Sequence, residues 1–121
     1  MITAGGRIDL EMNGEVYKPR GVVKIMPTSV EVESGTNMNG SGYRTIKPVN
    51  AKIELTFERD RFRWDDKMML ADWNVTVVER DVKPTVTHVA TAATMVGRPE
   101  IDTATGELTG ITLETDAYRA V

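Results

Sequence analysis

Residues 51–58 alternate strictly between apolar and polar side chains, and this period of two constrains the fold more than any other feature of the chain. Lys52, Glu54, Thr56 and Glu58 occupy the even positions, and apolar residues occupy the odd ones. Because successive side chains of a β-strand point to opposite faces of a sheet, the pattern predicts a strand with one buried face. A helix would spread the same residues around its whole circumference.

Short β-strands are predicted along most of the remaining chain. Residues 8–12 also alternate, and Asn13-Gly14 follows them, which is a strong hairpin signal because both central residues of a type I′ turn need positive φ. Further alternation, or a composition rich in valine and threonine, marks the other strands. We expect these strands at residues 15–18, 22–26, 29–33, 73–79, 85–96 and 107–115, the last with a bulge at Gly110.

Two segments depart from this pattern. Asp65 or Asp66 is suited to cap a short α-helix, which ends at Asn74 at the latest. Residues 34–48 are rich in turn-forming residues and poor in core residues, which indicates a long, mobile loop between two strands. The sequence therefore predicts a mainly β protein: a small antiparallel β-barrel or sandwich with one short flanking α-helix and a long inter-strand loop.

Length and composition fit one domain spanning residues 1–121. Hydrophobic residues make up 40% of the chain and charged residues 27%, as in ordinary globular proteins. The net charge of −3 gives no reason to expect binding to bulk nucleic acid or to anionic membranes, and no apolar run approaches the roughly 20 residues that cross a bilayer. With no cysteine and no export signal, we expect a protein made and folded in the cytoplasm.

The side chains available for catalysis are few. His88 is the only histidine, and no serine or carboxylate lies at a suggestive spacing from it, so neither a catalytic triad nor a multi-histidine metal site is expected. No phosphate-binding glycine motif connects a predicted strand to a helix, and residues 102–107 lack the repeated acidic positions of a calcium loop. We therefore expect a non-enzymatic protein with no cofactor and no metal.

Nucleic-acid binding is an alternative. Residues 57–64 interleave three arginines with aromatic side chains, the combination with which OB-like barrels bind single strands. Glu58, Asp60, Asp65 and Asp66 neutralise this stretch locally, and Phe57 belongs to the apolar face of the preceding strand. We favour packing or a subunit contact for these residues, with an OB-like nucleic-acid-binding module as the second hypothesis.

The order of motifs resembles a known family. The opening Gly6-Arg7-Ile8 through Asn13-Gly14, then Gly40-Ser41-Gly42-Tyr43 followed by Pro48 and Ile53-Glu54, and finally residues 71–77, resemble the tail tube proteins of Mu-like and related contractile phages. Val82-Lys83-Pro84 departs from the glycine-containing turn that we expect of that family. The likeness extends over nearly the whole chain and rests on a series of small motifs.

The resemblance implies a structural role and a set of partners. Copies of the chain would form hexameric rings that stack helically into the tube of a virion tail, and DNA would cross the lumen during ejection without specific binding. The surrounding sheath protein, the tape measure protein, the baseplate and the tail terminator are the other implied partners. The loop would contact the next ring through Ser34, Gly35, Asn37, Met38, Asn39, Gly40, Gly42, Tyr43 and Arg44.

A lumen wall can be assigned to the polar strand faces. If Val30 and Val32 face the core together with the apolar residues of 51–58, the opposite faces carry four acidic groups and one basic group, or −3 per subunit. Such a wall would repel phosphates and let DNA slide. A solvated strand face is the alternative for the same residues. The lumen-lining candidates are Glu31, Glu33, Lys52, Glu54, Thr56 and Glu58.

Overall fold

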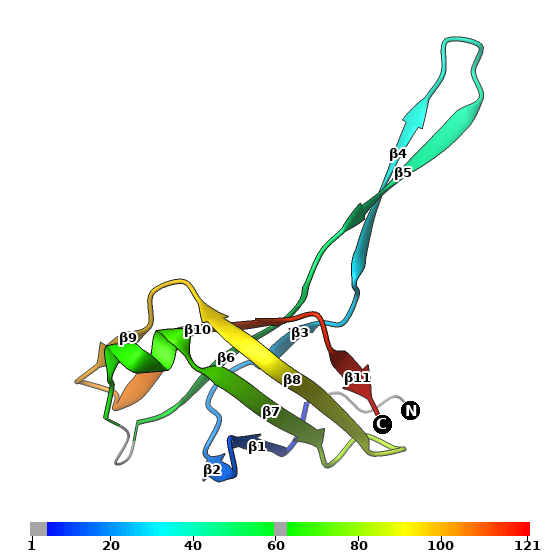
Figure 1. Cartoon of the computed structure of the whole chain (residues 1–121). Helices are drawn as coiled ribbons and strands as arrows, with labels where there is room; N and C mark the ends of the chain where they lie inside the picture. Colours follow the sequence, from blue (N-terminus) through cyan, green and yellow to red (C-terminus); the bar gives the residue numbers. More distant parts are fainter. Residues whose placement is uncertain (1–4, 60–62) are drawn as a thin grey trace.

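The structure, a computed structural model, describes residues 5–59 and 63–121 and consists almost entirely of antiparallel β-strands (Figure 1). This confirms the predicted mainly β class. The elements in chain order are β1 (Ile8–Met12), β2 (Glu15–Tyr17), β3 (Lys24–Met26), β4 (Val30–Thr36), β5 (Gly42–Pro48), β6 (Ala51–Glu58), η1 (Asp66–Leu70), β7 (Asp72–Glu79), β8 (Val86–Val96), β9 (Glu100–Asp102), β10 (Glu107–Thr115) and β11 (Tyr118–Ala120).

The strands form one large curled sheet and one separate hairpin. The large sheet runs in the order β2-β1-β7-β8-β10-β6-β3, with β11 added to β8 and β9 to β10. Its path is open from β2 to β3, so the predicted barrel is not closed. Residues 18–20 nevertheless run beside the end of β6, where the Arg20 N–H donates to the Thr56 carbonyl and the Glu58 N–H donates to the Lys18 carbonyl, both at 2.8 Å. These bonds connect the segment that follows β2, at one edge of the sheet, with the end of β6 near the other edge.

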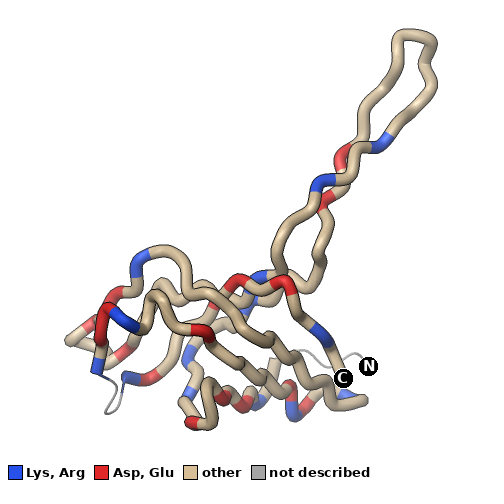
Figure 2. Tube along the Cα trace, viewed as in Figure 1, with Lys and Arg blue, Asp and Glu red and all other residues tan. Residues whose placement is uncertain are grey.

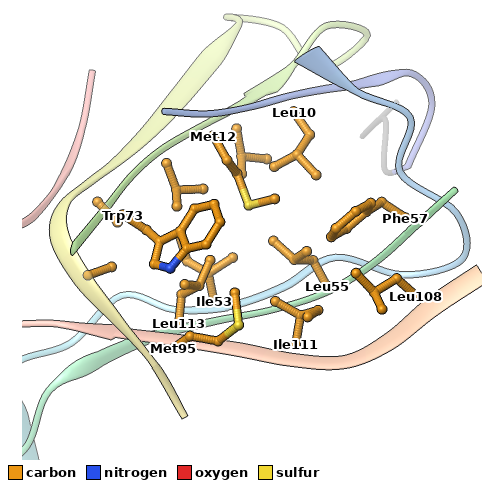
Figure 3. Close-up of a cluster of buried hydrophobic side chains, with 14 residues drawn as sticks. Leu10, Met12, Ile53, Leu55, Phe57, Trp73, Met95, Leu108, Ile111 and Leu113 are labelled. Carbon is orange, nitrogen blue, oxygen red and sulfur yellow. The ribbon is translucent and has the colours of Figure 1, made fainter. Parts of the chain in front are cut away.

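The core fills the inside of this curl (Figure 3). The alternation of β6 predicts it correctly, because Ile53, Leu55 and Phe57 are all at most 3% exposed. Trp73 of β7 is also buried, and its Nε1–H donates to the Met68 carbonyl at 3.0 Å, which holds η1 against the sheet. The other buried members are Leu10, Met12, Val75, Val77, Ala90, Ala93, Met95, Leu108, Ile111 and Leu113.

The hairpin turn after β1 and the bulge in β10 occur at the positions that the sequence predicts. Asn13 and Gly14 have φ of 52° and 84°, as the hairpin between β1 and β2 requires. The pairing of β10 with β6 shifts register between Leu108 and Ile111, and Gly110 has φ of 73° inside that shift. The predicted hairpin turn and the predicted bulge are both confirmed.

The predicted α-helix is instead a 3₁₀-helix, η1, and it is the one helical segment among residues 5–59 and 63–121. Asp65 caps it as expected, because its carboxylate accepts the Lys67 N–H at 3.0 Å. The helix has five residues before β7 begins at Asp72, which is too short for the costly nucleus of an α-helix to be repaid.

Residues 34–48 are not a loop but most of a long hairpin. β4 pairs with β5 from Val30↔Pro48 to Thr36↔Gly42, and only residues 37–41 form the turn between them. The hairpin projects away from the body of the protein (Figure 1), and we call residues 30–48 the arm. Val30 and Val32 are therefore 45% and 55% exposed on the arm, which corrects the prediction that they face the core.

Candidate assembly surfaces

The predicted inter-ring residues lie on the two strands of the arm and in the turn at its tip. Ser34 and Arg44 are direct partners across the two strands, as are Gly35 and Tyr43. The turn is closed by the Asn37 N–H, which donates to the Ser41 carbonyl at 2.7 Å, and by the Ser41 N–H, which donates to Asn39 Oδ1 at 3.0 Å. The remaining candidates, Met38, Gly40 and Gly42, lie in this turn or at its edge. The structure thus gathers all nine candidates in the outer half of the arm.

The arm exposes an unusual amount of apolar surface. Exposed large hydrophobic side chains number eleven in the described chain, and five of them belong to the arm. They are Val30, Val32, Met38, Tyr43 and Ile46, of which Met38 at the tip is fully exposed. The arm shares no ladder with the large sheet, and every residue of β4 and β5 except Gly35 is exposed. Apolar surface of this extent indicates a protein–protein contact.

A pocket of about 510 Å³ lies where the arm leaves the body. Ile25 and Met26 of β3 form one side of it, Val30 forms the side toward the arm, and Val49 follows β5. Met26 is 51% exposed at its mouth. We call this hollow the root pocket; its remaining lining residues are Pro27, Thr28, Glu31, Asn50 and Lys52.

The outer face of β6 brings together four of the six predicted lumen residues. Lys52, Glu54, Thr56 and Glu58 are partly exposed on it, opposite the core. Glu31 and Glu33 are not there, because they lie on β4 in the arm. The proposed wall is therefore divided between the body and the arm.

Neighbouring strands add charges to this face that the sequence pattern does not reveal. Lys52 Nζ lies 3.1 Å from a Glu114 carboxylate oxygen, and Lys24 of β3 stands opposite Glu54. Arg20 reaches Glu58 at 3.6 Å and Glu107 at 3.8 Å. The face around β6 thus combines four acidic with three basic groups, which leaves an excess of one negative charge rather than three (Figure 2).

The arginine-aromatic stretch does not form a stacking surface in the part of it that the structure describes. Phe57 is 1% exposed inside the core, 4.8 Å from Tyr17 between ring centroids. Trp64 is half-buried against the core cluster. Residues 60–62 lie outside the described residues. Packing, which the sequence favours for this stretch, accounts for both of its described aromatic side chains.

One polar cluster was missed by sequence reasoning. His88 on β8 lies between Glu79 of β7, with Nε2 3.0 Å from a carboxylate oxygen, and Tyr118 of β11, with Nδ1 2.5 Å from the phenol oxygen. Burial, together with the nearby Glu79 carboxylate, raises the pKa of Tyr118. The partners are 9 and 30 residues from His88, so no local motif could have revealed them. The cluster fastens the C-terminal strand to the sheet.

An ion pair fastens the start of β1. The Arg7 guanidinium lies 2.8 Å from Asp81 Oδ1, and the Arg7 N–H also donates to Asp81 Oδ2 at 2.6 Å. These hydrogen bonds lower the pKa of Asp81 to about 2. Within the described residues, no group of three or more histidine, cysteine or acidic side chains is arranged to hold a metal ion. None of the described helices is long and apolar enough to span a membrane.

Comparison with known proteins gives one family and one fold. A family model described as "Phage tail tube protein" matches residues 1–118. The solved structures include a chain from a cryo-EM structure of an extracellular contractile injection system, described as "PVC sheath/tube terminator in extended state". It is 14% identical, with a TM-score of 0.63 over 95% of this chain and 93% of that one, so it shares the fold. The search of curated proteins gave no match.

Proposed function

This chain belongs to the phage tail tube protein family, which makes it a structural, non-enzymatic protein of the phage tail, and we propose that its copies form hexameric rings that stack into a DNA-conducting tube. The observation that carries this proposal is the arm. A two-stranded hairpin is marginally stable in water by itself, and this one exposes apolar side chains on its length and at its tip. Packing of the arm on another subunit would remove both liabilities.

Ring formation is supported by the sheet margins. β2 and β3 end the large sheet, and both are only three residues long. An edge strand leaves a row of unpaired backbone N–H and C=O groups, and a three-residue edge gives a neighbouring chain a short ladder to which it can add. A closed ring would pair such margins in every subunit at once.

The outer face of β6 is our proposed lumen wall. Lys52, Glu54, Thr56 and Glu58 stand on it, and the nearby bases offset most of the acidic charge. A weakly negative wall would offer no cluster of unpaired cations to hold phosphates, so DNA would slide. Glu31 and Glu33 would extend the wall only where the arm passes from one ring to the next.

Family membership implies a location in the tail of the virion. We propose that the tube is enclosed by a sheath protein, is built around a tape measure protein, and ends at a baseplate and a tail terminator. The injection-system chain with the same fold is described as a sheath/tube terminator. A tail terminator that shares this fold could stack on the last ring of the proposed tube.

Electron microscopy of the purified chain across a range of concentrations tests the assembly. We expect rings or hollow tubes with sixfold end views above a critical concentration. Monodisperse monomers at every concentration, together with salt-dependent binding of single-stranded DNA, would contradict the tube and support the nucleic-acid hypothesis instead.

A further inference from the structure

We propose that the root pocket of one subunit receives the arm tip of a second copy of this chain, so that each arm is both a plug and part of the socket for the next. This inference rests on the proposed tube, and it specifies which two surfaces join. It is carried by the shape of the two surfaces, by their charges, and by their positions at opposite ends of one arm.

The socket is apolar where a side chain would enter. Ile25, Met26, Pro27, Val30 and Val49 line most of the root pocket, and Met26 and Val30 remain about half exposed at its mouth. The volume of about 510 Å³ is ample for a methionine together with part of a neighbouring aromatic ring. Filling it would remove apolar surface of both partners from water.

The plug presents a matching apolar group. Met38 lies in the turn with its whole side chain exposed, and Tyr43 is the second residue of the returning strand β5. Methionine adapts its shape to irregular cavities because it is unbranched and flexible. The turn is small and ordered by its own hydrogen bonds, among them Asn37 Nδ2 to Ser41 Oγ at 3.0 Å, so docking would need little further ordering.

Charge complements this apolar fit. Arg44 carries the one charge in residues 36–45, and it forms no ion pair within the described residues. The root pocket has two charged lining residues, Glu31 and Lys52, and Lys52 is already paired with Glu114 at 3.1 Å. Glu31 lies opposite Lys47 across the arm but forms no ion pair among the described residues. An incoming Arg44 would therefore meet a pocket whose unpaired charge is negative.

The position of plug and socket decides what their contact builds. The tip and the root pocket lie at opposite ends of the arm, so a subunit cannot fill its own pocket (Figure 1). The contact is head-to-tail, and such contacts propagate into open filaments with a direction. Seven-residue strands at about 3.3 Å per residue span roughly 23 Å, which sets the scale of the step between joined subunits.

Disulfide trapping tests the contact directly, because the chain contains no cysteine of its own. The variant Met38→Cys/Met26→Cys carries one thiol at the tip and one at the mouth of the root pocket. After assembly and mild oxidation, we expect a ladder of covalent oligomers on a non-reducing gel. Met38→Cys alone and Met26→Cys alone are the matched controls, and neither should extend beyond a dimer.

A second pair locates the tip if the pocket is wrong. Met38→Cys/Val16→Cys places the partner thiol on β2, where Val16 is 78% exposed. A ladder from this pair and none from the Met26 pair, in preparations that contain tubes, would overturn the root pocket while leaving the tube intact. Absence of tubes in the unmodified protein would instead contradict the proposed function.

Charge exchange tests the same contact without cysteines. Arg44→Glu and Glu31→Arg should each raise the critical concentration for assembly about tenfold, because each places like charges together. The double variant should return it to near the original value. Arg119→Glu, an exposed charge reversal on β11, is the control and should change little. A double variant as defective as the worse single one would overturn the pairing.

Discussion

The ring of Tyr43 lies over the backbone of Gly35, its direct partner across the arm. A Cβ atom at Gly35 would overlap that ring, so only glycine leaves room for it. Aromatic cover of a cross-strand glycine stabilises a ribbon that otherwise has little packing. The pair joins two inter-ring candidates of the sequence and explains how an isolated hairpin keeps its shape.

Gly35→Ala should loosen the arm without weakening the body. Displacing the ring costs on the order of 1 kcal/mol, which corresponds to about a fivefold rise in the population of molecules with an unpaired arm. Trypsin cleavage after Arg44 should accelerate by that factor at an unchanged Tm, whereas Lys47 is followed by Pro48 and is not a trypsin site. A Ser34→Ala variant, on the neighbouring position of β4, is the control, and equal cleavage of both variants would contradict the role of the Tyr43 ring.

Removing the arm should separate folding from assembly. The Val49 N–H donates to the Ser29 carbonyl at 3.0 Å, so the base of the arm is already closed and an Asn-Gly turn can replace residues 30–48. We expect this variant to unfold at nearly the original Tm, since no core residue belongs to the arm. Electron microscopy should show no tubes, and tubes of normal yield would contradict the assigned role of the arm.

Trp73 should be a major contributor to the stability of the body. Trp73→Ala removes a buried side chain and should lower the free energy of unfolding by about 3–5 kcal/mol. Trp73→Phe keeps part of the packing but removes the indole N–H that donates to the Met68 carbonyl, at a cost of about 1 kcal/mol for that hydrogen bond. Urea unfolding measures both. Leu70→Ala, on an exposed side chain of η1, should fall within about 0.5 kcal/mol of the unmodified protein.

Ala92 offers a stabilising substitution. It has φ of 52°, a left-handed conformation that costs an L-residue about 1–2 kcal/mol, whereas glycine adopts it freely. After the entropy lost by glycine on folding, Ala92→Gly should stabilise the protein by about 0.5–1 kcal/mol in urea unfolding. Ala93→Gly, at a buried neighbour without positive φ, should destabilise it, and the same sign for both would contradict the argument.

Low pH should break the ion pair between Arg7 and Asp81. The folded pKa of Asp81 is lowered from 3.8 to about 2, mainly by hydrogen bonds from Arg7, so its contribution to stability is full above pH 4. It is lost as the pH falls from about 4 to about 2, because the unfolded state then binds the proton more readily. Asp81→Asn should therefore flatten the pH dependence of urea unfolding in that range. An unchanged slope would contradict it.

The body of the fold was predictable because its strands have one solvent-exposed face and one buried face. Ile53, Leu55 and Phe57 alternate with polar residues, and burial of one face requires that pattern. Val30 and Val32 show the same pattern although both are exposed, and in the proposed tube they would contact another chain. Alternation by itself does not distinguish a core from a future interface.

Pairing between residues distant in the sequence explains the other features that the sequence did not predict. The charge on the outer face of β6 depends on Arg20 after β2, Lys24 on β3 and Glu114 on β10, which are distant from β6 in the sequence. The partners of His88 likewise come from β7 and β11. Such neighbours follow from strand order, which local patterns do not contain.

Because the hydrogen bond between Ser29 and Val49 closes the base of the arm, the length of the arm does not affect the packing of the body. Because this bond closes the arm below the first strand pair, residues can be added in opposite pairs along β4 and β5 without moving any residue of the core. Each added pair lengthens the ribbon by about 3.3 Å. The arm would then act as a ruler, and related tubes could differ in axial spacing while building their walls from the same sheet.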